Sequence, residues 1–245
     1  MRDCDIIETF RYQAKHTSVY ARYLELLGID PLRVKSPSDI PYLPIRFFKT
    51  HNIYNGQKPA MEVFTSSATT GMIPSRHPVD SLERYEKNVL EIFRHFYGDP
   101  SQYTILGLLP SYLERKGSSL VYMMKVLMEH GNTSEDGFYL YNRQALYKRL
   151  IALAAKNMPV WLLGVSFALL DFAREFTVHH PGLTIVETGG MKGRGTDLTR
   201  GELHRQLKQG FPQSPVHSEY GMAELFSQAY SCTEDDFFSC PPVMQ

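Results

Sequence analysis

The sequence predicts an α/β fold in which largely parallel sheets are covered by helices. Short apolar stretches alternate with amphipathic segments of helical spacing through most of the 245 residues. Such alternation is typical of βαβ units, whose parallel sheet carries helices on both faces. Glycine-containing polar motifs also follow the predicted strands, at the sheet edge where ligands of such folds bind. We therefore expect these loops to converge on one crevice.

Composition narrows the class of protein. Hydrophobic residues make up 43% and charged residues 21%, which indicates a globular chain. The 26 basic residues equal the 26 acidic ones, so there is no basic excess of the kind that a dedicated nucleic-acid binder shows. No apolar run is long enough to span a bilayer, and the N-terminus lacks the apolar core of a signal peptide. Cys4, Cys232 and Cys240 form neither a disulfide framework nor a paired zinc motif, so we expect a cytoplasmic protein.

The first 60 residues differ in pattern from the rest. Residues 5–28 have apolar side chains on one side of a helix, with Gly28 as its stop signal. Prolines and aromatics then alternate over residues 40–49, which indicates an extended segment packed over a core. We expect residues 1–60 to pack on an α/β domain formed by residues 61–245.

The elements of this domain follow from periodicity and from capping signals. Gly98 and Gly131 end two amphipathic segments, Asn142 can cap a third helix, and Thr199 with Glu202 forms a capping box for the last. Helices are predicted over 81–97, 118–130, 143–156, from 166 to before Pro181, and over 200–209. Strands are predicted over 61–64, 103–109, 138–141, 160–165, 183–186 and 216–218.

A run rich in hydroxyl groups follows the first of these strands. Five of the eight residues from Phe64 to Gly71 are serine or threonine. Exposed N–H groups and hydroxyls in a tight turn can bind a polyphosphate, and Gly71 permits close approach. The run is not a Walker A loop, because Met72 stands where that motif has lysine. A polar surface loop is the alternative interpretation.

Two further motifs follow later strands. Gly189 and Gly190 let the backbone approach a flat ligand, although an ordinary turn would look the same. Lys192 and Arg194 come next and could reach a phosphate or a carboxylate, or could belong to a mobile basic loop. The segment 220–224 reads Tyr-Gly-Met-Ala-Glu and ends in a carboxylate suited to Mg²⁺.

These motifs, in this order, resemble those of adenylate-forming enzymes, the acyl-CoA synthetase superfamily. Residues 65–74 resemble the phosphate-binding loop of that superfamily, with Ala68 in place of a glycine. Residues 220–224 resemble its Tyr-Gly-x-Thr/Ser-Glu motif, with Ala223 in the hydroxyl position. Residues 40–49 are similar to a segment of the acyl-protein synthetase family of bacterial bioluminescence, a branch of the same superfamily.

The resemblance implies the large N-terminal domain of such an enzyme, with ATP and Mg²⁺ as cofactors. It implies activation of a carboxylic acid, specifically a fatty acid, as an acyl-adenylate for transfer to a thiol of a protein cysteine, a carrier protein or CoA. The implied phosphate ligands are Thr65, Ser66, Ser67, Thr69, Thr70 and Gly71, and the implied adenosine contacts are Gly189, Gly190, Tyr220 and Gly221. Glu224 would bind Mg²⁺, and the implied catalytic residues are Glu224, Thr70 and Lys192.

The family pattern continues beyond the last motif, with an aspartate for the ribose, a hinge and a mobile lid. This sequence stops at Gln245, so we expect the lid to be absent from it. The sequence would then be a fragment, or a separate chain would supply the lid. Alternatively, the protein is a degenerate nucleotide- or acyl-binding module without turnover.

A serine hydrolase is a further alternative. Ser166 lies between a predicted strand and a helix in Gly-Val-Ser-Phe-Ala, as a nucleophile elbow would. Such an enzyme needs an acid and a histidine, for which Asp171 or Glu187 and His204 or His217 are candidates. A simpler interpretation is that Ser166 caps the helix that it begins, with its side chain bonded to backbone N–H groups of the first turn.

Overall fold

The computed structural model describes residues 3–56, 58–66, 73–110, 116–132, 137–139, 141–189, 198–233 and 237–242. Within these residues, the strands form a two-stranded hairpin and a six-stranded sheet of order β4-β3-β5-β6-β7-β8. The hairpin strands are β1 (Glu62–Thr65) and β2 (Arg76–Val79). The sheet strands are β3 (Thr104–Leu108), β4 (Phe138–Tyr139), β5 (Val160–Val165), β6 (Leu183–Thr188), β7 (Val216–Tyr220) and β8 (Ala229–Ser231). The strands from β4 to β7 are parallel and β8 is antiparallel, so the mainly parallel sheet is confirmed.

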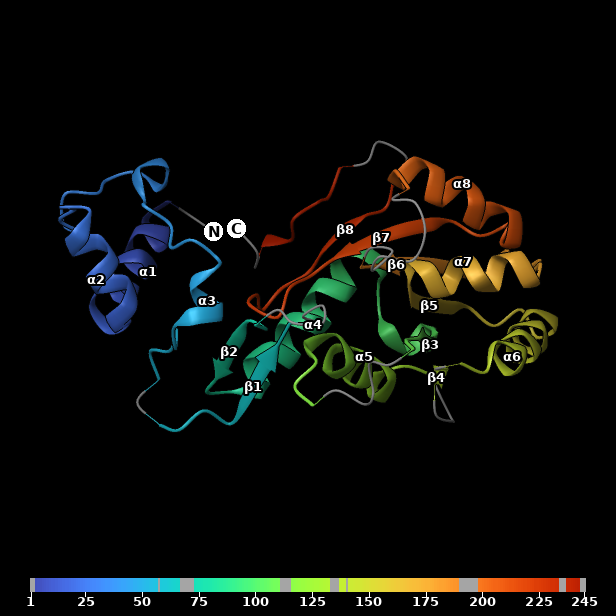
Figure 1. Ribbon diagram of the computed structural model, residues 1–245. Helices are drawn as coiled ribbons and strands as arrows, with labels where there is room; N and C mark the ends of the chain where they lie inside the picture. The colour runs from blue at the N-terminus through green and yellow to red at the C-terminus, as the bar shows by residue number, and fades with distance from the viewer. Residues whose placement is uncertain are drawn as a thin grey trace.

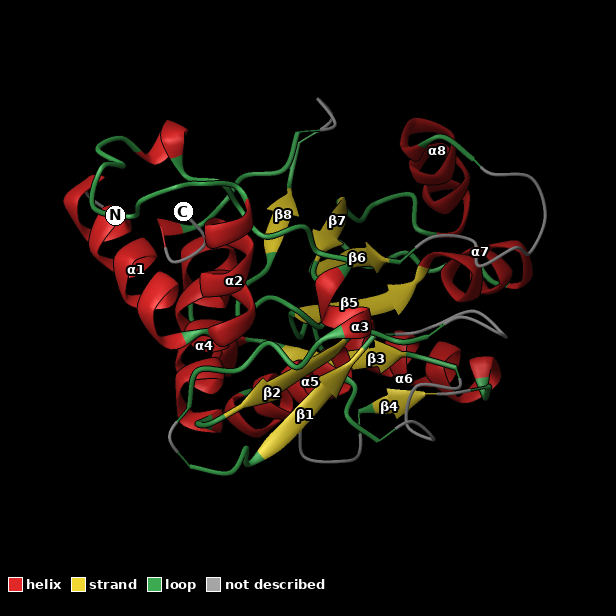
Figure 2. Ribbon diagram, turned by 60° about the vertical axis from the view of Figure 1, so that its left-hand side comes forward, coloured by secondary structure: helices red, strands yellow, loops and turns green. Residues whose placement is uncertain are grey.

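Helices cover both faces of this sheet, as Figures 1 and 2 show. The larger helices are α4 (Leu82–Tyr97), α5 (Ser119–His130), α6 (Arg143–Ala155), α7 (Ser166–Glu175) and α8 (Arg200–Gly210). Helices α7 and α8 pack together on one face, while α4 and α5 lie on the other. Both faces of the central strands are therefore buried, which is why β3 and β5 are continuous apolar runs.

Local signals explain where the helices begin and end. Asn142 accepts a hydrogen bond from the backbone of Ala145, and Thr199 forms the predicted capping box with Glu202. Gly98 ends α4 with a φ of 86°, a conformation that glycine adopts without strain. These predicted caps are confirmed. No helix among the described residues is both long and apolar enough to cross a membrane.

The N-terminal residues form a hydrophobic cluster of their own, separate from that of the sheet. Its helices are α1 (Asp3–His16) and α2 (Ser18–Leu26), and the short α3 (Phe47–Thr50) follows. The prediction of one helix over 5–28 is wrong, because the backbone becomes extended at Thr17. The break turns α2 back onto α1, so that the ring of Tyr20 packs edge-on against that of Phe10.

The segment 40–49 is partly as expected. Ile40 is buried in the N-terminal cluster, and the chain up to Pro44 has no regular secondary structure. Its last residues form α3 instead of continuing in extended form. Helix α3 packs against β2, a strand that was not predicted. Two 3₁₀ turns, η1 (Pro37–Asp39) and η2 (Pro100–Gln102), complete the described elements.

Candidate functional site

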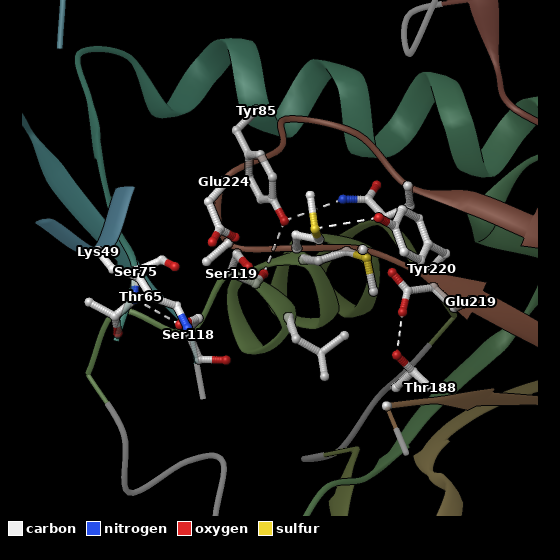
Figure 3. A pocket seen from close by; sticks show the side chains of 18 residues that line it. Lys49, Thr65, Ser75, Tyr85, Ser118, Ser119, Thr188, Glu219, Tyr220 and Glu224 are labelled. Carbon is white, nitrogen blue, oxygen red and sulfur yellow. Dashed lines mark hydrogen bonds between the residues drawn. The ribbon is translucent and has the colours of Figure 1, made fainter. Parts of the chain in front are cut away.

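A cavity of about 450 Å³ lies at the carboxyl ends of β1, β6 and β7 (Figure 3). Six residues that the sequence singled out line it: Thr65, Ser66, Gly189, Tyr220, Gly221 and Glu224. They come from three segments far apart in the sequence, so the structure brings the described parts of all three motifs together. The remaining candidates, Ser67, Thr69, Thr70, Gly71, Gly190, Lys192 and Arg194, lie outside the described residues.

The β1–β2 hairpin fixes the two ends of the hydroxyl-rich loop. The backbone N–H of Ser66 donates to the carbonyl of Ser75 at 3.1 Å, and the N–H of Ser75 donates to the Ser66 hydroxyl at 2.9 Å. The N–H of Thr65 donates to the carbonyl of Gly117 at 2.8 Å, which fastens the hairpin to the turn before α5. Among the described residues, the Ser66 hydroxyl accepts this bond and donates none, so its proton is available to a ligand at the cavity.

The register of β6 and β7 gives the cavity two distinct sides. Thr188 lies opposite Glu219, and successive side chains of a strand point to opposite faces. Glu219 is only 6% exposed, whereas its neighbour Tyr220 is 43% exposed. Tyr220 thus offers an open aromatic surface beyond the strand end. Glu219 points to the buried side.

Glu219 was not among the predicted site residues, yet its carboxyl lines the cavity. It accepts a hydrogen bond from the Thr188 hydroxyl. Burial raises the pKa of Glu219 to about 7, and the nearby charge of Glu187 adds to the shift. A side chain at position 221 would collide with this carboxyl, which explains the glycine there. Strand alternation is the sequence signal that could have placed Glu219 opposite Tyr220.

Helices α4 and α5 supply another wall of the cavity. The Tyr85 hydroxyl donates to the carbonyl of Ser119 at 3.1 Å and accepts from the Gln228 amide at 3.4 Å. Ser118 caps α5 by accepting from the N–H of Val121 at 3.3 Å. The start of α5 therefore faces the cavity, and its unpaired backbone N–H groups favour a negatively charged ligand group.

Lys49 at the end of α3 is a second lining residue that was not among the predicted site residues. Its side chain lies near Thr65 and Ser75, next to the base of the hydroxyl-rich loop (Figure 3). Lys49 is therefore a cation beside the described ends of the hydroxyl-rich loop, supplied by another segment of the chain.

Glu224 lies on the turn after β7, which aromatic packing and hydrogen bonds hold in place. His77 bonds through Nδ1 to the carbonyl of Ala223 at 3.0 Å and stacks on Phe226 with ring centroids 4.7 Å apart. The amide of Asn88 donates to the carbonyl of Phe226 at 3.0 Å. Burial lowers the pKa of His77, so its ring stays neutral near pH 7.

The cavity suits Mg²⁺ bound together with a phosphate ligand. Among the described residues, no group of three or more histidine, cysteine, aspartate or glutamate side chains could hold a metal by itself. Mg²⁺ commonly takes one or two carboxylates together with substrate phosphates and water. Glu224, which shares the cavity with hydroxyl groups and with the second carboxyl of Glu219, fits that mode of binding.

Ser166 does not cap α7, so that prediction is wrong. Val165 is the cap residue, and the Ser166 hydroxyl instead lies 2.8 Å from both the Glu187 carboxylate and the Gly189 carbonyl. Gly189 has a φ of 68°, and this contact fixes its carbonyl at the end of β6. Ser166 is the first residue of α7, whereas a capping serine would precede the helix. Its side chain therefore bonds to the end of β6 and not to the first turn of α7.

The surroundings of Ser166 do not suit a hydrolase. Glu187 lies between Ser166 and His204, whose Nε2 is 3.8 Å from the carboxylate and 3.0 Å from the Ser218 hydroxyl. Burial alone would raise the pKa of Glu187, but interactions with His204, Ser218 and Ser166 outweigh it and hold that pKa below its usual value. A nucleophilic serine needs histidine as its base, and here its partner is an ionised acid.

Comparisons with known proteins support the fold. No protein-family model matches the sequence, and no curated protein is similar to it in sequence. Two crystal structures of 2-hydroxyisobutyryl-CoA ligase with 2-HIB-AMP and CoA match, one in an open conformation and one in the thioesterification state. Both have a TM-score of 0.66 over 98% of this chain, with 15% and 17% identity respectively. The chain spans about half of their length, 54% and 53%. The fold of this chain is therefore that of the N-terminal domain of adenylate-forming ligases.

Proposed function

We propose that this chain binds Mg-ATP and activates a carboxylic acid as an acyl-adenylate for transfer to a thiol, as an acyl-protein synthetase would. The observation that carries the proposal is the meeting of three motifs around one cavity. Residues 65–66, Gly189 and residues 220–224 all line it, although more than 150 positions separate the first from the last. The fold of adenylate-forming ligases supports the same assignment.

The reaction consists of two substitutions. A carboxylate oxygen attacks the α-phosphorus of ATP, the bond to the β-phosphate breaks, and pyrophosphate leaves. A thiol sulfur then attacks the acyl carbonyl, loses its proton, and releases AMP. The protein must align the reacting atoms and neutralise the phosphate charge.

Each task is assigned to residues at the cavity. Thr65, Ser66 and Lys49 would bind the phosphates, and Glu224 would hold Mg²⁺. Tyr220 would flank the adenine, together with Gly189 and Gly221. From the implied motifs, Ser67, Thr69, Thr70 and Gly71 would also bind phosphate, and Gly190 would also contact the adenosine. Thr70 and Lys192 would act in catalysis together with Glu224.

The partners follow from the resemblance. The acceptor is the thiol of a protein cysteine, a carrier protein or CoA, and a fatty acid is the implied class of acid. A lid domain would align the reactants, whether it lies on the same polypeptide or on a separate chain. The exposed thiols of Cys4, Cys232 and Cys240 suit a reducing compartment, and we place the protein in the cytoplasm.

One observation favours a second candidate, a nucleotide- or acyl-binding module without turnover. Ala223 is buried at the position where the superfamily motif has a hydroxyl group. Ala68 likewise replaces a glycine of the phosphate loop. Such a module would bind the ligands of the cavity without releasing pyrophosphate.

ATP–pyrophosphate exchange separates the two candidates. We would measure exchange over a panel of fatty and aryl acids, on this chain and on a longer polypeptide that carries its native downstream sequence. Acid-dependent exchange that is lost in Glu224→Gln supports the ligase. Mg-ATP binding without exchange in either polypeptide supports the binding module. Exchange at an unchanged rate in Glu224→Gln contradicts the assigned site.

A further inference from the structure

One part of the cavity serves none of the proposed nucleotide contacts. We call it the inner wall, formed by Tyr85, Met123, Thr188, Glu219 and Gln228. Thr188 and Glu219 come from adjacent strands in register, and the other three side chains line the same cavity. Tyr220 and Gly189 lie beyond Glu219 and Thr188 in their strands, so a nucleotide held by them leaves the inner wall free.

The hydroxyl protons of the inner wall are already used within the protein. Thr188 donates to Oε2 of Glu219, and Tyr85 donates to the carbonyl of Ser119. Among the described residues, Thr188 is the only hydrogen-bond partner of the Glu219 carboxyl, so its Oε1 has none. Within the described residues, the inner wall therefore presents to the cavity an acceptor oxygen that has no protein partner and is open to a ligand.

The inner wall suits a hydrogen-bond donor of the ligand, whereas the opposite end of the cavity suits an anionic group. Lys49 and Ser118, the cap residue of α5, lie there, whereas Glu219 and Thr188 lie at the other side, with Tyr85 between them (Figure 3). A cation and free backbone N–H groups favour an anionic group at that end. The cavity as a whole thus suits a molecule with an anionic end and a hydrogen-bond-donating end.

We propose that the carboxylic acid activated in this cavity carries a hydrogen-bond donor, an amino or hydroxyl group, that binds the Glu219 carboxyl. This inference rests on the proposed function and names its class of substrate. An unsubstituted alkyl chain would cover the free oxygen of Glu219 without offering a partner, and leaving a buried acceptor unpaired is costly. The proposal therefore replaces the plain fatty acid that the resemblance implies with a substituted one.

The electrostatics of the inner wall agree with this assignment. Burial raises the pKa of Glu219, as expected for a carboxyl that has no cationic partner among the described residues. An ammonium group on the ligand would supply that partner and favour the ionised form. A hydroxyl group would donate to either form, so the two classes of acid differ in their pH dependence.

Matched acids provide the test. We would titrate the full chain by calorimetry with hexanoate, ω-hydroxyhexanoate and ω-aminohexanoate, and with the corresponding octanoates, at about pH 8. The substituted acids should bind about 10- to 100-fold more tightly than the plain ones, the range for a hydrogen bond to a charged group. If only the ω-amino acids bind more tightly than the plain acids, the group bound by Glu219 is an ammonium. If the ω-hydroxy acids also bind more tightly, a neutral donor is sufficient.

Variants and pH tie the preference to Glu219. Glu219→Gln, nearly equal in shape, should lose the preference for the amino acids while its affinity for Mg-ATP stays unchanged. Glu91→Gln, the same change on the exposed side of α4, should behave as the unmodified chain. If Glu219→Gln does not fold, the unmodified chain still decides, because its preference for the amino acids should grow from about pH 6 to pH 8 as Glu219 ionises.

Several results would overturn the proposal. These are equal or tighter binding of the plain acids, no binding of any acid, or a preference that survives in Glu219→Gln. Weaker Mg-ATP binding in that variant would assign Glu219 to the nucleotide instead. A chain that prefers substituted acids but does not bind Mg-ATP would refute the proposed function and leave the role of Glu219 intact.

Discussion

The carboxyl of Glu219 should make the stability of this protein depend on pH in an unusual direction. Its folded pKa of about 7 lies above the ordinary value of 4.5. The folded state therefore binds the proton more tightly than the unfolded state. The stability that Glu219 contributes is fully present below pH 4.5 and is lost as the pH rises through about 7.

The size of the effect follows from the shift. The difference between about 7 and 4.5 corresponds to about 3 kcal/mol in the free energy of unfolding, most of which falls between pH 5 and pH 8. Burial also lowers the pKa of His217 to about 4, which removes stability as the pH falls below 6.5. The two groups oppose each other, so the unmodified chain alone does not reveal either one.

The difference between the unmodified chain and Glu219→Gln isolates the carboxyl. Glutamine cannot ionise, so the variant should gain about 2–3 kcal/mol of stability relative to the unmodified chain between pH 5 and pH 8. Urea denaturation followed by fluorescence of Trp161, the single and fully buried tryptophan, gives both free energies. A difference that stays constant over this range, as we expect for the control Glu91→Gln, would refute the reasoning about the buried carboxyl.

Three further substitutions test the site. Lys49→Met should weaken Mg-ATP binding roughly tenfold in calorimetry, as loss of a charged contact does, with the unfolding free energy unchanged because Lys49 is exposed; unchanged affinity would remove Lys49 from the phosphate site. Gly221→Ala should cost about 1–3 kcal/mol of stability in urea denaturation, because the new methyl group meets the Glu219 carboxyl. Adding Glu219→Ala should restore that stability, and a failure of this rescue would contradict the contact. Ser166→Ala should lower the free energy of unfolding by about 1–3 kcal/mol, because its hydrogen bonds to Glu187 and Gly189 are lost. Esterase activity that is present in the unmodified chain and absent from this variant would support the serine hydrolase alternative.

Much of the sheet could be predicted from sequence, because buried parallel strands are continuous apolar runs. Strand β5 was predicted with its observed bounds, Val160–Val165. Strand β2 could not be predicted, since Arg76–Val79 is polar, contains Pro78 and is a strand only through its pairing with β1. The turn at Thr17 has no glycine or proline to mark it and depends on the packing of α2 against α1.

The motifs predicted the lining of the cavity only in part. The pattern from Tyr220 to Glu224 begins one residue after Glu219, so the buried carboxyl fell outside it. It lines the cavity together with Tyr85, which is distant in sequence, and no local pattern reports that neighbour. Lys49 reaches the cavity because α3 packs against β2, an arrangement that only tertiary structure establishes.

Calorimetric titration of the folded chain with Mg-ATP shows directly whether the cavity binds the nucleotide. The cavity carries the proposed contacts to phosphate, adenine and Mg²⁺, so we predict binding in the millimolar range or tighter. Glu224→Gln should remove the part of the affinity that depends on Mg²⁺ and should retain the binding of free ATP. A folded chain that binds no Mg-ATP at millimolar concentrations, or a Glu224→Gln variant with unchanged Mg²⁺ dependence, would contradict the assignment of this cavity to the nucleotide.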